Sequence, residues 1–309
     1  MPSQNSDSPR GLVFALCAYG MWGLLPIFMK ALAHVPASEV IAHRVLWSLP
    51  IAGAVLVWQG RADDVLAAFR RPRLLAMAAV TAALISVNWL IYVWSIANDH
   101  ALDAALGYYI NPIFSVIVGA TLLKESLSRL QMAAVALAAA AVAILTVDAG
   151  RLPLVAIGLT LSWGMYAYCK KRLPLGPNQG FTLEVLLLAP LAAAWLVWIT
   201  LRGEGHFGPS DGWTSMLLIA CGPVTAVPLL FYANGAKLLR LSTIGILQYL
   251  TPTAIFLCAV LIFHEPMGGA RLIAFPMIWA ALAVYSVTLI RQAGARRRLR
   301  AGAGTQRAQ

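Results

Sequence analysis

The chain has 309 residues, of which 60% are hydrophobic and only 11% are charged, and its formal net charge is +11. Roughly a quarter of the residues in a soluble globular domain are charged. The composition therefore excludes an ordinary soluble protein and indicates a membrane protein. The four cysteines lie in apolar stretches and form no CxxC pair, which disfavours both a disulfide framework and a metal site.

Ten apolar stretches follow one another along the chain, and each is close to the roughly 20 residues that a helix needs to cross a bilayer. They are residues 11–30, 39–58, 73–97, 102–123, 129–147, 153–171, 180–201, 214–236, 243–263 and 270–291. The runs are continuous and about twice as long as a barrel strand, which indicates helices. The predicted fold class is an all-α integral membrane protein with ten transmembrane helices. The first stretch is too long for a signal-peptide core, so we expect it to be retained.

The positive charges predict the orientation of these spans. If the N-terminus is inside, 18 of the 23 lysines and arginines fall on the inner side, 4 fall outside, and Arg44 remains within a span. This bias predicts that both termini are cytoplasmic and that the number of spans is even. The basic C-terminal tail fits attraction to anionic lipid better than binding to nucleic acid.

Two halves of the chain carry the same element, 140 residues apart. Tyr109-Ile110-Asn111-Pro112 precedes Glu125 as Tyr249-Leu250-Thr251-Pro252 precedes Glu265, and Tyr92 and Tyr232 keep the same offset. Because each half has five spans, an odd number, the two repeats must be inverted in the membrane. The predicted organisation is a tail over 1–10, a first repeat over 11–147, a second repeat over 153–291 and a basic cytoplasmic tail over 292–309.

Several motifs resemble a known family. Residues 18–26, with Trp22-Gly23, are similar to the first-helix signature of drug/metabolite transporters of the EamA type. Residues 35–48, with His43-Arg44, and residues 88–89, 106–112 and 240–245 resemble the RarD subgroup. The resemblance runs from about residue 10 to residue 291. It implies ten helices in two inverted five-helix repeats and an inner-membrane exporter of small metabolites. The subgroup is named for a chloramphenicol-sensitivity phenotype, not for a substrate.

Arg44 is the first candidate site residue. An arginine at the centre of a span costs roughly 2.5–3.5 kcal/mol on insertion scales. It either faces a cavity, where it would attract a carboxylate or phosphate of the substrate, or extends to the outer interface. The resemblance favours the cavity. Glu184 stands at the equivalent position of the second repeat, but inverted symmetry disfavours a direct pair and makes Glu184 a gate candidate at the opposite side.

Glu39 and His43 are four residues apart and can share a helix face. His43 titrates near physiological pH and could couple transport to protons. The alternative is that Glu39 complements the helix dipole and His43 is a hydrogen-bonded packing residue. Both interpretations stay open from the sequence.

The fourth span is the best candidate to line a central cavity. Asn111 lies on one stripe with Tyr108, Ser115 and Gly119, beside Tyr109, and Pro112 frees backbone carbonyls at membrane depth. The other candidates come from the first, third, eighth and ninth spans: Tyr19, Trp22, Asn88, Tyr92, Tyr232, Asn234, Gln248 and Tyr249. Packing between helices is the alternative for any of them. Glu125 and Glu265 end two equivalent spans and are either gate residues or interface anchors.

Motifs for enzymatic chemistry are missing. His264-Glu265 begins like a zinc-protease motif but has no second histidine, and there is no G-x-S-x-G or Walker loop. The sequence therefore predicts a secondary transporter without a cofactor, working by alternating access on a small molecule that carries a carboxylate or other anionic group. The alternatives are a non-transporting membrane sensor or assembly partner with the same fold, and a passive channel.

Overall fold

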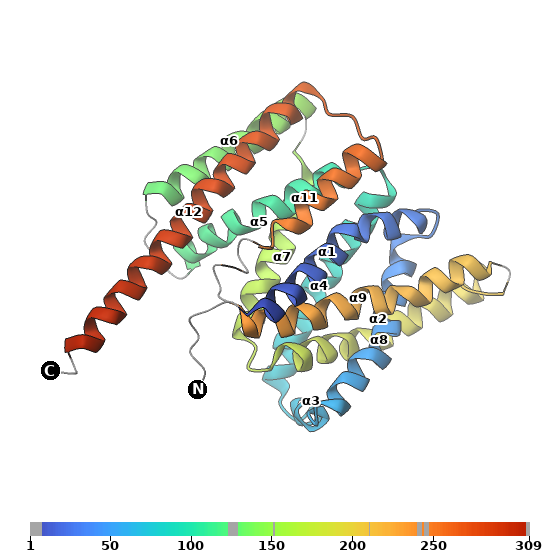
Figure 1. Cartoon of the computed structure of the whole chain (residues 1–309). Helices are drawn as coiled ribbons and strands as arrows, with labels where there is room; N and C mark the ends of the chain where they lie inside the picture. The colour runs from blue at the N-terminus through green and yellow to red at the C-terminus, as the bar shows by residue number, and fades with distance from the viewer. Residues whose placement is uncertain are drawn as a thin grey trace.

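The computed structural model describes residues 8–306 apart from 123–128, 151, 210, 240–242 and 244–246. Every element in this part of the chain is a helix (Figure 1). The first half contains α1 (Pro9–Ala31), α2 (Ala37–Trp58), the short α3 (Ala62–Ala68), α4 (Pro72–Ala97), α5 (Ala101–Leu122) and α6 (Arg129–Ala149). The second contains α7 (Leu154–Arg172), α8 (Pro177–Leu201), α9 (Gly212–Leu238), α11 (Leu250–Leu257), the π-helical turn η1 (Cys258–Ile262) and α12 (Gly269–Gln306).

Seven of the described helices are long and apolar enough to cross a membrane, and a shorter apolar helix covers Leu250–Ile262. The seven are α1, α2, α4, α6, α8 and segments of α9 and α12. The expected spans 102–123 and 153–171 correspond to α5 and α7, which have 22 and 19 residues. The chain is therefore a multi-pass helical membrane protein. The helix α12 also continues through most of the expected tail, which is rich in alanine and arginine, both good helix formers.

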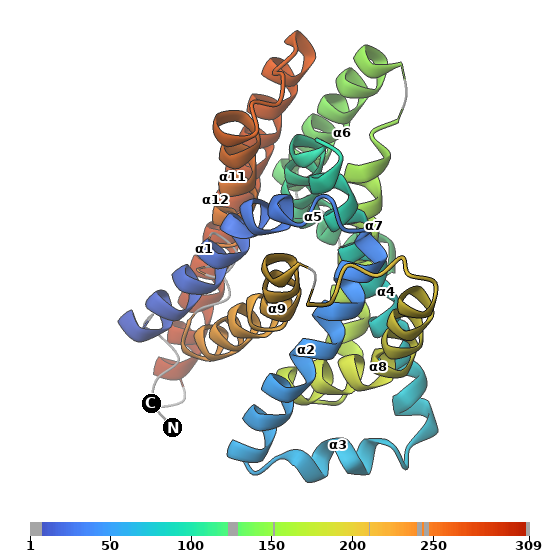
Figure 2. The same cartoon turned by 90° about the vertical axis from the view of Figure 1, so that its right-hand side faces the viewer.

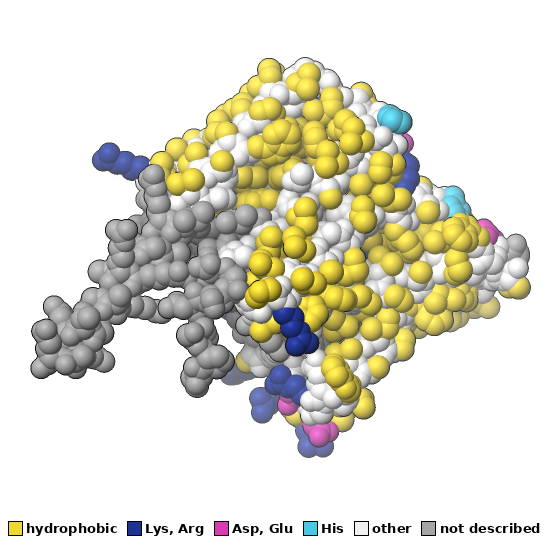
Figure 3. Space-filling model, in the orientation of Figure 1, with side chains coloured by type: hydrophobic (Ala, Val, Ile, Leu, Met, Phe, Trp, Pro, Cys, Tyr) yellow, Lys and Arg dark blue, Asp and Glu magenta, His cyan; other side chains and the backbone are white. Residues whose placement is uncertain are grey.

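The outer surface agrees with a lipid environment. Trp58, Val147 and Leu201 are each more than 80% exposed. Hydrophobic side chains spread across the face shown in Figure 3, and the charged side chains gather near its margins. Such a large exposed apolar surface is unfavourable in water and favourable against lipid tails.

The helices pack in pairs that the two halves share. α1 packs against α9 as α7 packs against α4, and α1 packs against α11 as α7 packs against α5. α2 meets α8, and α6 lies beside α12 at one side of the bundle (Figure 1).

Glycines allow the closest of these approaches. A Cβ on Gly23 of α1 would meet Ala254 of α11, and a Cβ on Gly164 of α7 would meet the ring of Phe114 of α5. Ala254 and Phe114 are themselves 140 residues apart. The same helix contact is thus built twice from equivalent positions, as small residues at helix interfaces permit.

The bundle has two ends, each defined by the connections between helices. The α1–α2 end holds the connections after α1, α4, α6, α8 and η1, and the α3 end holds α3 and the connection after α7. Figure 2 shows α3 lying across its end of the bundle below α2 and α8. Both α2 and α8 contact α3.

Candidate functional site

Arg44 is buried inside the bundle. Its side chain comes from the third turn of α2, about 10 Å along the helix, and is only 4% exposed. The guanidinium Nε donates to Oγ1 of Thr225 on α9 at 3.0 Å. The guanidinium also lies over the ring of Trp89 on α4, 4.6 Å from its centroid. Arg44 therefore joins three helices and does not extend to the interface.

Two buried donors beside this contact have no hydrogen-bond partner among the described residues. They are Nη1 of Arg44 and the hydroxyl of Tyr92. Tyr92 and Tyr108 both lie within electrostatic range of the guanidinium. Buried polar groups are nearly always paired. An unpaired cationic donor in the same buried region as an unpaired hydroxyl is therefore suited to an anionic group.

Tyr108 and Asn88 are hydrogen-bonded to each other, and the Tyr108 ring contacts the Tyr92 ring. The Tyr108 hydroxyl donates to Oδ1 of Asn88 at 3.2 Å, and the Asn88 amide donates to Oγ of Ser162 at 2.9 Å. The rings of Tyr92 and Tyr108 are 5.9 Å apart. This network joins α4, α5 and α7 and brings together three of the predicted residues, Asn88, Tyr92 and Tyr108. Arg44 reaches the same helix, α4, through Trp89, the residue after Asn88.

A second aromatic group contains Tyr19, Trp22 and Tyr232. Their ring centroids are 5.6–5.9 Å apart, with Tyr19 and Trp22 on α1 and Tyr232 on α9. Edge-to-face contacts of this kind fix ring positions in a packed interior. The expected first-span and eighth-span candidates therefore do meet.

Glu184 pairs with Lys170, not with Arg44. The Lys170 ammonium is 2.6 Å from the Glu184 carboxylate, and the Tyr166 hydroxyl donates to the same carboxylate at 3.3 Å. Glu184 is 2% exposed. This partner could not be predicted from the sequence, because Lys170 belongs to a basic run that the charge bias assigns to the membrane surface.

Glu39 and His43 also have other partners than each other. Glu39 is 1% exposed and bonds His206 in the connection between α8 and α9. His43 Nδ1 accepts from the Trp47 indole at 3.1 Å, and its ring lies 5.0 Å from that of Phe207. His206 and Phe207 could not be predicted from the sequence, because a connection between helices has no periodic pattern of residues.

The remaining candidates lie elsewhere. Tyr109 donates to Thr253 at 2.8 Å and packs with Phe275 and Trp279, and Tyr249 packs against the same core. Asn234 is exposed and bonds the Leu230 carbonyl of its own helix. Asn111 is buried and Gln248 is partly buried. The side chains of Pro112, Ser115 and Gly119 lie outside the described part of the structure.

Glu265 caps a helix of the other half. Its two carboxylate oxygens accept from the backbone N–H groups of Ala101 and Leu102, at 2.7 and 3.0 Å. These are the first residues of α5, where unpaired amides and the helix dipole favour a negative charge. Burial raises the pKa of the Glu265 carboxyl, and the hydrogen bonds from the two backbone N–H groups oppose that rise. Its equivalent, Glu125, lies outside the described residues.

Sequence comparison agrees with this architecture. The model of the EamA-like transporter family matches residues 9–147 and again residues 152–287. The chain belongs to this family. Protein RarD of Streptomyces exfoliatus is 39% identical over 306 residues, covering 99% of this chain and 97% of the relative. Protein RarD of Escherichia coli K12 is 37% identical over 281 residues, covering 91% and 95%. The predicted RarD subgroup is thereby confirmed.

Further relatives of this EamA-family chain are also transporters by name. An "Uncharacterized transporter" of Vibrio cholerae is 40% identical over 301 residues, covering 97% of this chain and 99% of the relative. One crystal structure superposes with a TM-score of 0.60 at 21% identity, covering 93% of this chain and all of its own. At that identity the likeness shows the fold alone. The chain is therefore a membrane protein of a transporter family.

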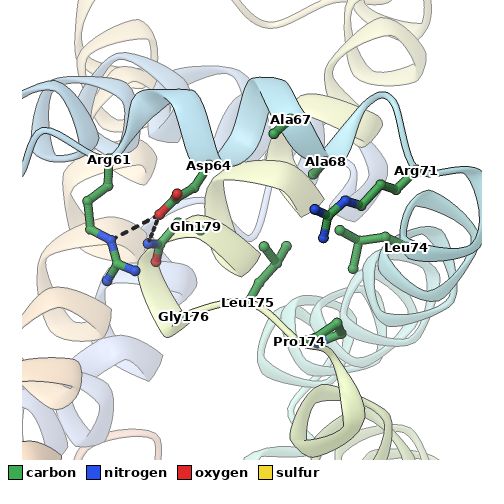
Figure 4. A pocket seen from close by; sticks show the side chains of 10 residues that line it. All are labelled: Arg61, Asp64, Ala67, Ala68, Arg71, Leu74, Pro174, Leu175, Gly176 and Gln179. Carbon is green, nitrogen blue, oxygen red and sulfur yellow. Dashed lines mark hydrogen bonds and ion pairs between the residues drawn. The ribbon is translucent and has the colours of Figure 1, made fainter.

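The EamA-family chain has a separate polar contact at the α3 end. Asp64 of α3 accepts from the Gln179 amide of α8 and from Nε of Arg61, both at 3.0 Å (Figure 4). They border a pocket of about 230 Å³ that Arg71 also lines. The hydrogen bonds from the Gln179 amide and the Arg61 guanidinium hold the pKa of Asp64 below its ordinary value. No periodic pattern in the sequence indicated α3, which has only seven residues.

Proposed function

We propose that the protein is a secondary transporter of the bacterial inner membrane that exports small molecules bearing a carboxylate or another anionic group. One observation carries this proposal. Arg44 is buried within the bundle and held by Thr225 and Trp89, and among the described residues neither its Nη1 nor the buried Tyr92 hydroxyl has a hydrogen-bond partner. Ionisable groups inside membrane spans generally mark substrate pathways.

Alternating access is the proposed mechanism, with ten transmembrane helices in two inverted repeats and both termini cytoplasmic. Support comes from the helix pairs that recur when the halves are exchanged and from the double match to the family. The bias of positive charges supports the orientation. Rocking of one repeat against the other would expose Arg44 to each side in turn.

The aromatic groups would shape the pocket around the rest of the substrate. Tyr19, Trp22 and Tyr232 lie on α1 and α9, and Tyr92 and Tyr108 lie on α4 and α5. These helices come from both halves, which is where repeat-built transporters bind their cargo. A compound with an anionic head and an apolar or aromatic body fits this arrangement.

The test is metabolite profiling of medium and cytoplasm in strains that express the native chain, Arg44→Ala or neither. We expect an anionic compound to be enriched outside only with the native chain. Arg202→Ala is a matched control, because Arg202 also lies over an indole ring, that of Trp198 at 4.7 Å, but is 54% exposed and bonds Glu204 at the surface. Identical profiles in all strains would contradict export and favour the sensor or assembly alternative.

A flux assay in proteoliposomes separates the carrier from a channel. A carrier saturates and exchanges labelled substrate against unlabelled substrate on the other side, because its site faces one side at a time. Flux that rises without saturation would support the passive channel.

A further inference from the structure

The connection between α8 and α9 is hydrogen-bonded to the start of α2. Glu39 Oε1 accepts from the backbone N–H of His206 at 2.8 Å, and Oε2 lies 2.8 Å from Nδ1 of the same residue. The carboxylate is almost fully buried by this contact. Bonds of a charged acceptor to a backbone donor and to a ring nitrogen hold one residue in a single orientation.

Phe207 extends this contact toward the site. Its ring lies 5.0 Å from that of His43 and 6.3 Å from that of Trp47, on either side of Arg44 in the sequence of α2. His34 in the connection after α1 lies 6.3 Å from the His206 ring and is hydrogen-bonded to Thr214 of α9. At the α1–α2 end, the connection therefore contacts both Glu39 and the residues that flank Arg44 in the sequence of α2.

An equivalent contact closes the opposite end. Gln179 stands 140 residues after Glu39 and is likewise buried near the start of its helix, α8. It donates to Asp64 of α3, the segment that follows α2, at 3.0 Å (Figure 4). Asn178 adds a bond to Gln59 at 3.1 Å. The segment after α2 is thus hydrogen-bonded to the start of α8. In the same way, the segment after α8 is hydrogen-bonded to the start of α2.

We infer that Glu39–His206 and Gln179–Asp64 are the two gate latches of this transporter, one at each end of the bundle. The inference rests on the proposed transport function, in which each end must open once in a cycle. Both latches are formed in this structure, as an arrangement closed at both ends requires. With the proposed orientation, Glu39–His206 is the outer latch and Gln179–Asp64 is the inner latch.

A native thiol reports on the state of the latches. Cys221 of α9 is fully buried, and its carbonyl accepts from the Thr225 hydroxyl that also binds Arg44. In a chain whose other cysteines, Cys17, Cys169 and Cys258, are replaced by alanine, a membrane-impermeant maleimide added to intact cells reaches Cys221 only through the outer gate. This measurement needs no transported substrate.

Glu39→Gln removes the charge from the outer latch. We expect the rate of Cys221 labelling from outside to rise by about tenfold or more, since a charge-assisted hydrogen bond is worth at least one factor of ten in an equilibrium. Glu204→Gln is the matched control, because Glu204 is in the same connection, its carboxylate bonds only Arg202 among the contacts described, and its side chain is 55% exposed. Its labelling should equal that of the parent chain.

His206→Ala is the second variant, which leaves the Glu39 carboxylate and the backbone bond in place. It should raise labelling less than Glu39→Gln, and a monodisperse elution profile in detergent shows that each variant is folded. Equal labelling of the parent, both latch variants and the control would overturn the outer latch. So would rapid labelling of the parent chain itself.

The inner latch is tested with the same reporter in inside-out vesicles. Asp64→Ala should raise labelling of Cys221 from the inner side, and the adjacent exposed Asp63→Ala should not. If labelling responds as expected but no compound is ever exported, the latches stand and the transport proposal fails. If export is observed while labelling is unchanged, transport stands and the latches are wrong.

Discussion

At the scale of single residues, Arg44 is held by a directional bond to Thr225 and by stacking on Trp89. Lysine keeps the charge but has neither a planar group to stack nor several donors in a fixed plane. We expect Arg44→Lys to export with an apparent KM about tenfold higher, and Arg44→Ala to lose export, because one hydrogen bond to a charged group is worth roughly 1.5–3 kcal/mol. Initial export rates at several substrate concentrations measure both. Normal export by both variants would show that Arg44 does not face the substrate.

Glu265 acts on stability through the helix that it caps. Removing its carboxylate leaves the buried N–H groups of Ala101 and Leu102 without acceptors. We expect Glu265→Ala to lower the free energy of unfolding by about 1–3 kcal/mol. Thermal unfolding in detergent measures the change, and Glu204→Ala, which removes an exposed carboxylate, should leave Tm within experimental error. An unchanged Tm for Glu265→Ala would mean that water replaces the cap.

Asp64 gives the inner contact a definite pH dependence. Its pKa is lowered, first by the Gln179 amide and then by Arg61, so the contact is stabilised above the pKa of the unfolded chain and is lost only as pH falls through the lowered folded value. We therefore expect labelling of Cys221 from the inner side to be constant between about pH 5 and pH 8, after correction for the thiolate fraction. A rise in labelling within that range would show that another titrating group controls the α3 end.

At the scale of elements, α2 and α9 can approach closely because position 222 of α9 is a glycine. A Cβ on Gly222 would overlap the backbone of Trp47, which cannot move without shifting α2 and Arg44 with it. We expect Gly222→Ala to lower the free energy of unfolding by about 1–3 kcal/mol, as overpacking generally does. Gly53→Ala in α2 is the control: a Cβ there meets no atom within 4 Å, and alanine favours the helix by up to about 1 kcal/mol. Equal stability of the two variants would mean that the helices separate at little cost.

The connections matter as much as the spans at this scale. The α8–α9 connection and α3 are short, yet each contributes a residue that bonds a buried side chain near the start of a long helix. Loops positioned on a rigid scaffold commonly carry function. Here each one can hold or release an end of the bundle, because each is hydrogen-bonded to a helix of the other repeat and the proposed mechanism moves the two repeats against each other.

At the scale of the whole molecule, the orientation in the membrane is directly measurable. Fusions of a fluorescent protein and of alkaline phosphatase to the C-terminus should give a fluorescent and a phosphatase-negative strain, because 18 of the 23 positive residues fall on the predicted inner side. A fusion of phosphatase within the α8–α9 connection should be active. The reverse pattern would exchange the outer and inner latches but leave their geometry unchanged.

Much of this molecule could be predicted from the sequence alone. Hydrophobic runs of spanning length predict membrane helices, because lipid offers no partner to an unpaired backbone group. The 140-residue offset predicts equivalent contacts, and Gly23 with Ala254 and Gly164 with Phe114 fit that expectation. The motifs around His43-Arg44 and Tyr108–Pro112 indicated the RarD subgroup, and the relatives confirm it. All of this follows from periodicity, composition and local motifs.

Only the tertiary structure decided which polar groups are partners. Glu39 bonds His206 and not His43, Glu184 bonds Lys170 and not Arg44, and Glu265 caps α5 from 164 residues away. The physical reason is that a buried charge must find its partner in three dimensions, and its nearest neighbours in space come from helices and connections that are distant in the chain. Helical spacing shows which residues share one face of a helix. The partner of a buried charge on that face comes from another helix or connection.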